Sequence, residues 1–218
     1  MDKQVLISPS ILSADFANMQ RDIERLQSWG ADLIHCDVMD GNFVPNITFG
    51  MPMVAAISKV AALPLDVHLM IDKPEKYIDA FIDSGANILT FHPEASNKPL
   101  DALKRIRERG VKSGIVLNPN IDFFDWAHLA PYCDIILIMS VYAGFGGQKF
   151  IEQTYGKIQA IKGYLVKEGL DLLLEIDGGV NEQNSAKLIA HGIDILVAGS
   201  AIFKSDNPAR TIANLKKY

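Results

Sequence analysis

Eight short apolar segments recur along the chain, and a longer, mostly amphipathic stretch separates each one from the next. The segments are Val5–Ser8, Asp32–Asp37, Leu65–Leu69, Asn87–Phe91, Lys112–Leu117, Asp134–Ser140, Leu172–Ile176 and Asp194–Ala198. Most of them are apolar throughout rather than alternating, which is typical of strands buried on both faces of a parallel sheet. Eight strand–helix units in 218 residues predict a (β/α)8 TIM barrel.

The intervening stretches carry helix signals. Asp72 is placed to cap a helix that has Pro74 in its first turn and ends at Gly85. Apolar residues from Tyr155 to Leu165 form one helical stripe that ends at Gly169. The glycines that end such helices also precede several of the apolar segments, as expected of a helix turning into the next strand.

A doubly wound open sheet is the alternative fold, because it is also built from repeated strand–helix units. The number of units and the absence of a Gly-x-Gly-x-x-Gly fingerprint after the first segment favour the barrel; Ser8-Pro9-Ser10 follows instead. The sequence contains no stretch that resembles a linker. We therefore expect one catalytic domain over residues 1–218.

Composition excludes several classes of partner. The net charge of −5 argues against nucleic acid, which needs a basic surface. No apolar run approaches the length of a membrane span, and the N-terminal one is too short for a signal peptide. The two cysteines, Cys36 and Cys133, cannot form a disulfide framework and indicate a reducing compartment, so we expect a cytoplasmic protein.

Four polar residues stand where predicted strands end. His35 and Asp37 are two apart on one strand and so share a face, His68 ends the next strand, and Asp177 ends the seventh. One buried histidine alone is usually structural, but two carboxylates buried together without a cation would be costly. Two imidazoles and two carboxylates suit one divalent ion, Zn²⁺ first and Mn²⁺, Fe²⁺ or Co²⁺ as alternatives, whereas Mg²⁺ and Ca²⁺ prefer oxygen ligands.

The remaining candidates near these strands are weaker. His92 fits either the barrel mouth or a loop cap. His128 and His191 lie in helical stretches that we expect to be exposed, and Asp40 reads as a turn residue rather than a ligand.

Glycine loops follow the last three predicted strands. They are Gly144-Phe145-Gly146-Gly147, Asp177-Gly178-Gly179 and Ala198-Gly199-Ser200. Glycine lets the backbone approach a ligand closely, amides at the start of a helix attract anions, and barrels of this kind often bind phosphate after strands 7 and 8. A single glycine pair is usually only a turn, but three such loops in succession predict a phosphorylated substrate.

Dispersed motifs resemble the ribulose-phosphate 3-epimerase family along essentially the whole chain. The matching segments are Ser8–Asp15, His35–Asn46, Asp66–Met70, Gly144–Phe150, Glu175–Asn181 and Ala198–Ser200. The resemblance implies a TIM barrel of the ribulose-phosphate-binding type and an isomerase of carbohydrate metabolism. Its reaction would be metal-dependent epimerisation at C3 of a ketose phosphate, D-ribulose 5-phosphate to D-xylulose 5-phosphate in the pentose phosphate pathway, through a metal-stabilised enediolate.

The resemblance also implies residue roles. Asp37 and Asp177 would be the acid/base pair and, with His35 and His68, the metal ligands. The substrate-binding residues would be Ser10, His68, Gly144, Phe145, Gly146, Gly147, Gly178, Gly179, Gly199 and Ser200, with Ser10 and His68 at the sugar and the later glycines and Ser200 at the phosphate. Members of the family form dimers or hexamers, which implies a homo-oligomer.

Two departures leave the sugar open. The family usually has Asn-Pro-Gly where this chain has Tyr142-Ala143-Gly144, and the stretch from His92 to Glu94 resembles allulose-6-phosphate 3-epimerases. D-Allulose 6-phosphate is therefore the alternative substrate.

Two other classes compete with an epimerase. Phosphate-binding barrel decarboxylases share the late glycine loops but carry Asp-x-Lys-x-x-Asp, and this chain has no lysine in the segment from His35 to Asp40. A non-catalytic binding protein would have no need of two intact carboxylates.

Overall fold

The computed structural model describes residues 4–217, so Met1–Lys3 and Tyr218 of the predicted domain 1–218 lie outside the described residues. Its strands are β1 (Leu6–Pro9), β2 (Ile34–Met39), β3 (Leu65–Met70), β4 (Ala86–Phe91), β5 (Lys112–Leu117), β6 (Ile135–Met139), β7 (Leu173–Asp177) and β8 (Ile195–Ala198). The helices are α1 (Met19–Ser28), α2 (Met51–Val60), α3 (Ile78–Asp83), α4 (Pro99–Glu108), α5 (Phe123–Trp126), α6 (Thr154–Glu168), α7 (Ser185–Ala190), α8 (Ser200–Phe203) and α9 (Pro208–Leu215). Each predicted strand overlaps an observed one, with bounds that differ by at most two residues.

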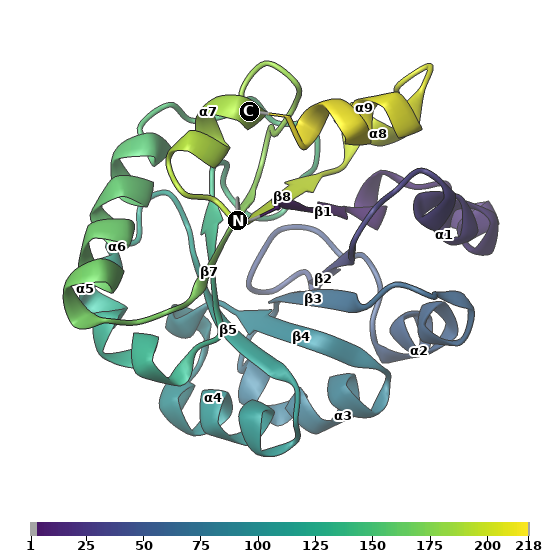
Figure 1. Cartoon of the computed structure of the whole chain (residues 1–218). Coiled ribbons are helices and arrows are strands. Elements are labelled where there is room, and N and C mark those ends of the chain that lie inside the picture. Colours follow the sequence, from purple (N-terminus) through teal and green to yellow (C-terminus); the bar gives the residue numbers. More distant parts are fainter. Residues whose placement is uncertain (1–3, 218) are drawn as a thin grey trace.

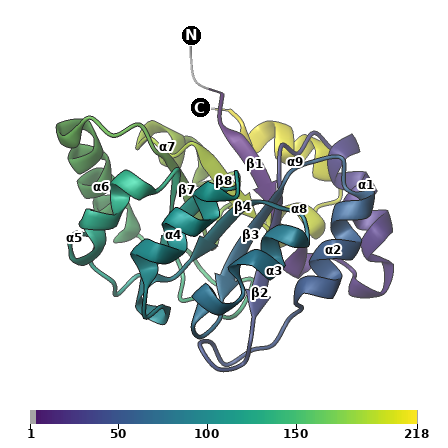
Figure 2. The same cartoon turned by 90° about the horizontal axis from the view of Figure 1, so that it is seen from below.

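The strands form a parallel sheet in the order β1-β8-β7-β6-β5-β4-β3-β2. The sheet curls until β1 meets β2, where the Ile7 carbonyl accepts hydrogen bonds from the amides of Asp32 and Leu33, and Ser10 bridges to His35. The strands therefore form a barrel, with the helices around its outside (Figures 1 and 2). The barrel is confirmed and the open doubly wound sheet is excluded.

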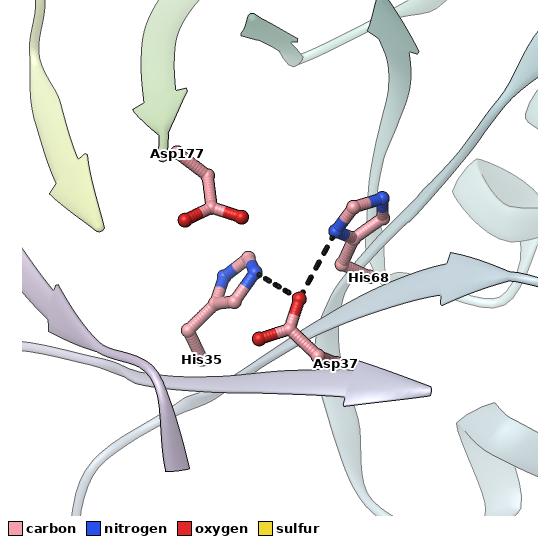
Figure 3. Close-up of side chains that lie close together, drawn as sticks. All are labelled: His35, Asp37, His68 and Asp177. Carbon is pink, nitrogen blue, oxygen red and sulfur yellow. Dashed lines mark ion pairs between the residues drawn. The ribbon is translucent and has the colours of Figure 1, made fainter. Parts of the chain in front are cut away.

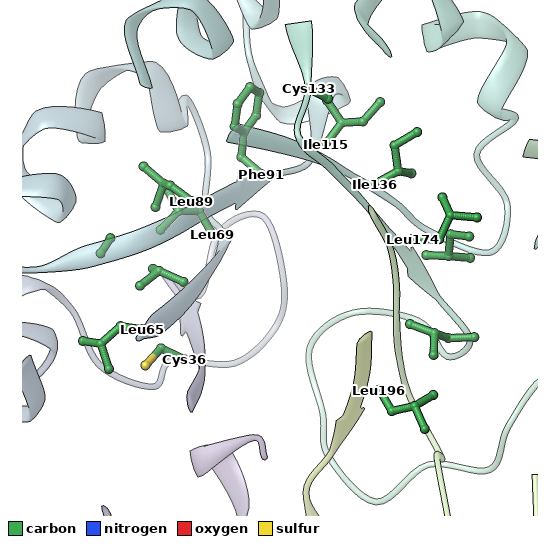
Figure 4. Close-up of a cluster of buried hydrophobic side chains, with 14 of the residues drawn as sticks. Cys36, Leu65, Leu69, Leu89, Phe91, Ile115, Cys133, Ile136, Leu174 and Leu196 are labelled. Atoms are coloured by element: carbon green, nitrogen blue, oxygen red, sulfur yellow. The ribbon is translucent and has the colours of Figure 1, made fainter. Parts of the chain in front are cut away.

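The main hydrophobic core lies between the strands and the surrounding helices. On β3, Leu65, Val67 and Leu69 belong to this core, and Cys36, Phe91 and Leu174 occupy matching positions on other strands (Figure 4). The alternate residues of β3, Asp66 and His68, are also fully buried but point to the other face of the strand, the barrel interior. The fold thus places polar side chains inside the barrel while an apolar layer supports it from outside.

One predicted helix is different in the structure. Lys73, in the left-handed region at φ +51°, precedes a 3-10 turn at Pro74–Lys76, and α3 begins only at Ile78. The proline signal therefore marks a separate turn rather than the first turn of the helix. Tyr77 lies just before α3 and is 42% exposed, so the buried stripe of this short helix is Ile78 and Phe81.

The longest helix matches its prediction. α6 buries Tyr155, Ile158, Ile161 and Leu165 on one face. It ends at Gly169, whose φ of +66° is the left-handed conformation that favours glycine.

Candidate active site

Three strands bring four polar side chains together inside one end of the barrel. β2 carries His35 and Asp37 on one face, β3 carries His68, and Asp177 ends β7 (Figure 3). One potential ligand atom from each of the four lies within 4.8 Å of the others. The structure therefore assembles the predicted cluster from residues up to 142 positions apart in the sequence (177 − 35).

The two imidazole rings turn one nitrogen each toward the same carboxylate oxygen. His35 Nε2 and His68 Nδ1 both lie 3.3 Å from Asp37 Oδ1, and neither has a well-formed hydrogen bond. Ser10 Oγ donates to the other oxygen, Asp37 Oδ2, at 2.6 Å. Buried ring nitrogens without a good partner, facing two carboxylates, are the arrangement expected of a cation site.

The far side of His35 contacts acidic residues that sequence reasoning missed. His35 Nδ1 lies 2.6 Å from Asp66 Oδ2, which also accepts a hydrogen bond from Ser8 Oγ at 3.0 Å. Glu175 Oε1 lies 3.9 Å from the same nitrogen of His35. Asp66 and Glu175 each stand two residues before a proposed ligand, on the same strand face, so the two-residue period was the signal that would have found them.

The charges of the cluster in the absence of a metal are set by burial and by neighbours. Burial alone would lower the pKa of His35, but the carboxylates of Asp66 and Asp37 raise it well above its ordinary value. Burial alone would raise the pKa of Asp37, but the charge of His35 holds it well below its usual range. A proton on His35 therefore supplies the positive charge that a cation would replace.

On β7, across the barrel, the pKa values of two acidic residues are raised rather than lowered. Burial, reinforced by the charge of Asp37, raises the pKa of Asp177 to about 7. Burial and the charge of Asp66 raise the pKa of Glu175 well above its ordinary value. Burial lowers the pKa of His68 to about 4, so its ring is neutral. The pKa values of the two aspartates that face each other are thus shifted in opposite directions.

A cavity opens above the cluster and collects most of the residues predicted to bind substrate. Its lining includes Ser10, Asp37, Gly144, Phe145, Gly146, Gly147, Asp177, Gly178, Gly179, Gly199 and Ser200. His68 is fully buried beneath this lining. Met39, Met70 and Met139, all nearly inaccessible to solvent, complete the wall on the β2, β3 and β6 sides.

Several of the cavity glycines have close neighbours, and Gly179 and Gly199 are two of them. Gly179 has a φ of +64°, and a Cβ atom there would lie 2.6 Å from the Phe150 nitrogen. A Cβ atom on Gly199, just before α8, would lie 2.6 Å from Ser13 Oγ. At Gly179 the colliding atoms belong to the backbone, so glycine is required there, whereas at Gly199 the Ser13 hydroxyl would have to rotate away.

Loops from different strands close the mouth of the cavity. Asn46 Nδ2 donates to the Gly144 carbonyl at 2.8 Å, which ties the loop after β2 to the loop after β6. Tyr142 and Phe145 on the second loop are each 55% exposed. The chain's departure from the family pattern, Tyr142-Ala143, therefore lies in the cavity lining.

The secondary candidates occupy the following positions. His92 is fully buried and lies beside His68. His128 is exposed as predicted, whereas His191 is half-buried, packs on Tyr155 and contacts the Lys187 carbonyl. Asp40 is a turn residue, because its carboxylate accepts hydrogen bonds from the amides of residues 42, 43 and 72.

Comparison with known proteins identifies the family. The sequence profile of the Ribulose-phosphate 3 epimerase family matches residues 6–203. The chain belongs to the ribulose-phosphate 3-epimerase family. It is therefore an enzyme of the isomerase class, which excludes the non-catalytic alternative.

Relatives across this epimerase family match over almost their whole length. The chain is 45% identical over 213 residues to ribulose-phosphate 3-epimerase of Bacillus subtilis (strain 168), which covers 97% of this chain and 98% of the relative. It is 46% identical over 220 residues to the Synechocystis enzyme, covering 99% and 95%. It is 41% identical over 215 residues to the Escherichia coli (strain K12) enzyme, and this match covers 98% of this chain and 96% of the relative.

Solved structures resemble the epimerase in fold alone. The 3-hexulose-6-phosphate synthase of Salmonella typhimurium aligns with a TM-score of 0.73 at 15% identity, covering 97% of this chain and 96% of that one. KGPDC from Streptococcus mutans aligns with a TM-score of 0.74 at 12% identity, covering 98% and 96%. Within residues 4–217, no helix is both long and apolar enough to cross a membrane.

Proposed function

We propose that this enzyme interconverts the C3 epimers of a ketose phosphate, with D-ribulose 5-phosphate and D-xylulose 5-phosphate as the pair. The observation that carries the proposal is the placement of Asp37 and Asp177, which reach one metal-type cluster from β2 and β7 beneath a cavity lined by glycine loops. Inverting a carbon next to a carbonyl requires a base on one face and an acid on the other, and this pair supplies both.

One divalent metal ion fits the four-residue cluster. His35 Nε2, His68 Nδ1 and a carboxylate oxygen from each of Asp37 and Asp177 would hold it, and the two ring nitrogens have no better partner. The mixed nitrogen and oxygen set favours Zn²⁺, with Mn²⁺, Fe²⁺ or Co²⁺ as alternatives. A bound ion would act as a Lewis acid that stabilises the enediolate formed when the C3 proton leaves, which contributes several kcal/mol.

The two aspartates would then move the protons. Asp37, whose pKa is held low, is ionised and suited to accept the C3 proton. Asp177, which reaches the same cluster from β7, would deliver a proton to the opposite face. Because the two carboxylates share one cluster, they titrate as a coupled system, and their roles exchange in the reverse reaction.

The rest of the cavity would bind and shield the substrate. Ser10 and His68 would contact the sugar, with Gly144 and Phe145 in the covering loop. The backbone of Gly146, Gly147, Gly178, Gly179, Gly199 and Ser200 would bind the phosphate. The buried thioethers of Met39, Met70 and Met139 would keep water away from the enediolate.

The cellular setting is part of the proposal. Cys36 and Cys133 are buried free thiols, which supports a reducing compartment such as the cytoplasm. The homo-oligomer and the single catalytic domain over residues 1–218 stay predictions, which sedimentation and limited proteolysis would test.

The decisive experiment compares kcat/KM for D-ribulose 5-phosphate and D-allulose 6-phosphate on one preparation whose metal content is measured. We expect the pentulose phosphate to be preferred, in keeping with the names of the relatives. A preference for the hexulose phosphate would favour the alternative, for which Tyr142-Ala143 in the cavity lining is the supporting observation. No turnover of either sugar by the metal-loaded enzyme would contradict the proposal.

A further inference from the structure

A fifth buried side chain contacts the proposed metal cluster from outside it. His92 follows β4, the neighbour of β3, and its Nε2 lies 3.0 Å from His68 Nε2. Both rings are completely buried. Since His68 Nδ1 faces Asp37, His92 occupies the one remaining hydrogen-bonding position of this imidazole.

The second nitrogen of His92 has its own partners. His92 Nδ1 lies 3.4 Å from Glu94 Oε1 and 3.3 Å from Asn118 Nδ2, and that amide is also 3.3 Å from Glu94 Oε1. Asn118 is held in turn, because Lys157 Nζ donates to the Asn118 carbonyl at 2.7 Å and to the carbonyls of residues 119 and 121. The Phe43 ring, with its centroid 4.8 Å from that of His92, packs against the imidazole.

The chain of contacts permits one assignment of the ring protons. If His68 Nδ1 is the ligand atom, the neutral ring carries its proton on Nε2 and donates to His92 Nε2. His92 then carries its proton on Nδ1 and donates to the Glu94 carboxylate. The Asn118 amide cannot donate to a nitrogen that already bears a proton, so it donates to Glu94 as well.

We propose that His92 is a positioning residue that fixes the tautomer and orientation of the metal ligand His68, and that Glu94 holds His92 in this role. The inference rests on the proposed function, because it requires His68 to bind a metal. His35 contacts the Asp66 carboxylate directly. His68 instead contacts the His92 imidazole, which in turn contacts the Glu94 carboxylate. The support of His68 therefore extends to Glu94, whose side chain is 24% exposed.

Replacement of His92 tests this directly. His92→Leu removes the acceptor for the His68 Nε2 proton, and loss of such an outer partner typically weakens metal affinity by about 10- to 100-fold. His92→Gln offers a carbonyl oxygen near the same position and should restore most of that affinity. Thr90→Val is the matched control, since Thr90 is a fully buried polar residue two positions earlier whose hydroxyl makes only a 3.5 Å contact with the Val67 carbonyl.

The measurements are the Kd for Zn²⁺, from competition with a chromogenic chelator, and the visible absorption spectrum of the Co²⁺-loaded protein. We expect weaker binding and an altered Co²⁺ spectrum for His92→Leu, and values close to the parent for His92→Gln and Thr90→Val. An unchanged Kd and spectrum in a folded His92→Leu protein would overturn the proposal, as would equal weakening by Thr90→Val.

Two further outcomes are decisive. If His92→Leu does not fold, Glu94→Leu and Glu94→Gln replace it, because Gln keeps an acceptor for the His92 Nδ1 proton; equal affinity in these two variants would overturn the inference. If the parent protein binds no metal, both the proposed function and the inference about His92 fail. If the parent protein binds metal and epimerises its substrate, but His92→Leu binds metal with unchanged affinity, only the inference about His92 is refuted.

Discussion

Replacing Asp177 with asparagine separates the chemistry of this carboxylate from its place in the fold. Asparagine has nearly the shape of a protonated carboxyl group, which is the form that the raised pKa of Asp177 indicates below about pH 7. The variant can neither deliver nor accept a proton. We expect a folded protein whose turnover falls by at least about 10²- to 10⁴-fold, the usual contribution of one acid/base group.

The same variant should be more stable than the parent when both are free of metal. Burial raises the folded-state pKa of Asp177 to about 7 from its ordinary value of 3.8. A raised folded pKa means that the stability supplied by the protonated form is present below about pH 4 and is lost as the pH rises through about 7. Since one unit corresponds to roughly 1.4 kcal/mol, the advantage of asparagine should grow from near zero at pH 4 to about 4 kcal/mol at pH 8.

Activity and proton exchange can be followed together. NMR of D-ribulose 5-phosphate in D₂O reports both epimerisation and loss of the C3 proton. With Asp37 intact, any residual exchange should be confined to one epimer, because only one face retains a base. Chemical denaturation of the metal-free proteins at pH 5 and pH 8 gives the stability difference. Asp40→Asn, at the same end of the barrel but in a turn, is the control that should keep near-parent turnover.

Two results would refute the reasoning. Near-normal epimerisation by Asp177→Asn would refute the two-base mechanism. Equal exchange of the C3 proton in both epimers would show that a single group acts on both faces of the substrate. A metal-free variant that is less stable than the parent at pH 8 would contradict the raised pKa of Asp177.

The other predictions concern the metal and the phosphate. Removal of the metal by a chelator should abolish epimerisation, with recovery on adding Zn²⁺, Mn²⁺ or Co²⁺; full rate in a protein shown metal-free by elemental analysis would exclude the Lewis-acid role. Metal affinity should fall as the pH drops below about 7, because Asp177 then takes up a proton that competes with the ion, and competition titrations giving a flat Kd from acid to neutral pH would contradict this. Gly179→Ala should raise KM by about 5- to 150-fold, the equivalent of about 1–3 kcal/mol, because the new Cβ would collide with the Phe150 backbone and displace the glycine loop. Gly110→Ala shares the positive φ (+75°) but has open space around it, so its KM should not change, and an unchanged KM for Gly179→Ala would remove Gly179 from the phosphate site.

The fold was accessible from sequence because it depends on a repeated local pattern. Each buried parallel strand must be apolar on both faces, and each covering helix needs a stripe that ends at a residue such as Gly169, so the units could be recognised separately. The pattern failed at Lys73–Tyr77, where the proline signal is the same for a helix and for a 3-10 turn. Only the packing of Ile78 and Phe81 against the core decides where that helix starts.

The candidate ligands were accessible for a related reason. A two-residue spacing fixes the shared face of His35 and Asp37 by strand geometry alone. The same rule applies to Asp66 and Glu175, but these residues lie inside their strands, one step deeper in the barrel, where no strand end marks them. Their importance comes from contacts across the barrel with His35.

The sequence by itself determined the eight strand–helix units, the four candidate ligands, the glycine loops and the family, because each is encoded in residues that are close together or in motifs of fixed spacing. Closure of the barrel decided the rest. It set Asp37 opposite Asp177 so that their pKa values shift in opposite directions, and it placed His92 beside His68. Such shifts and contacts depend on burial and on distances between different strands, and no local pattern in the chain specifies them.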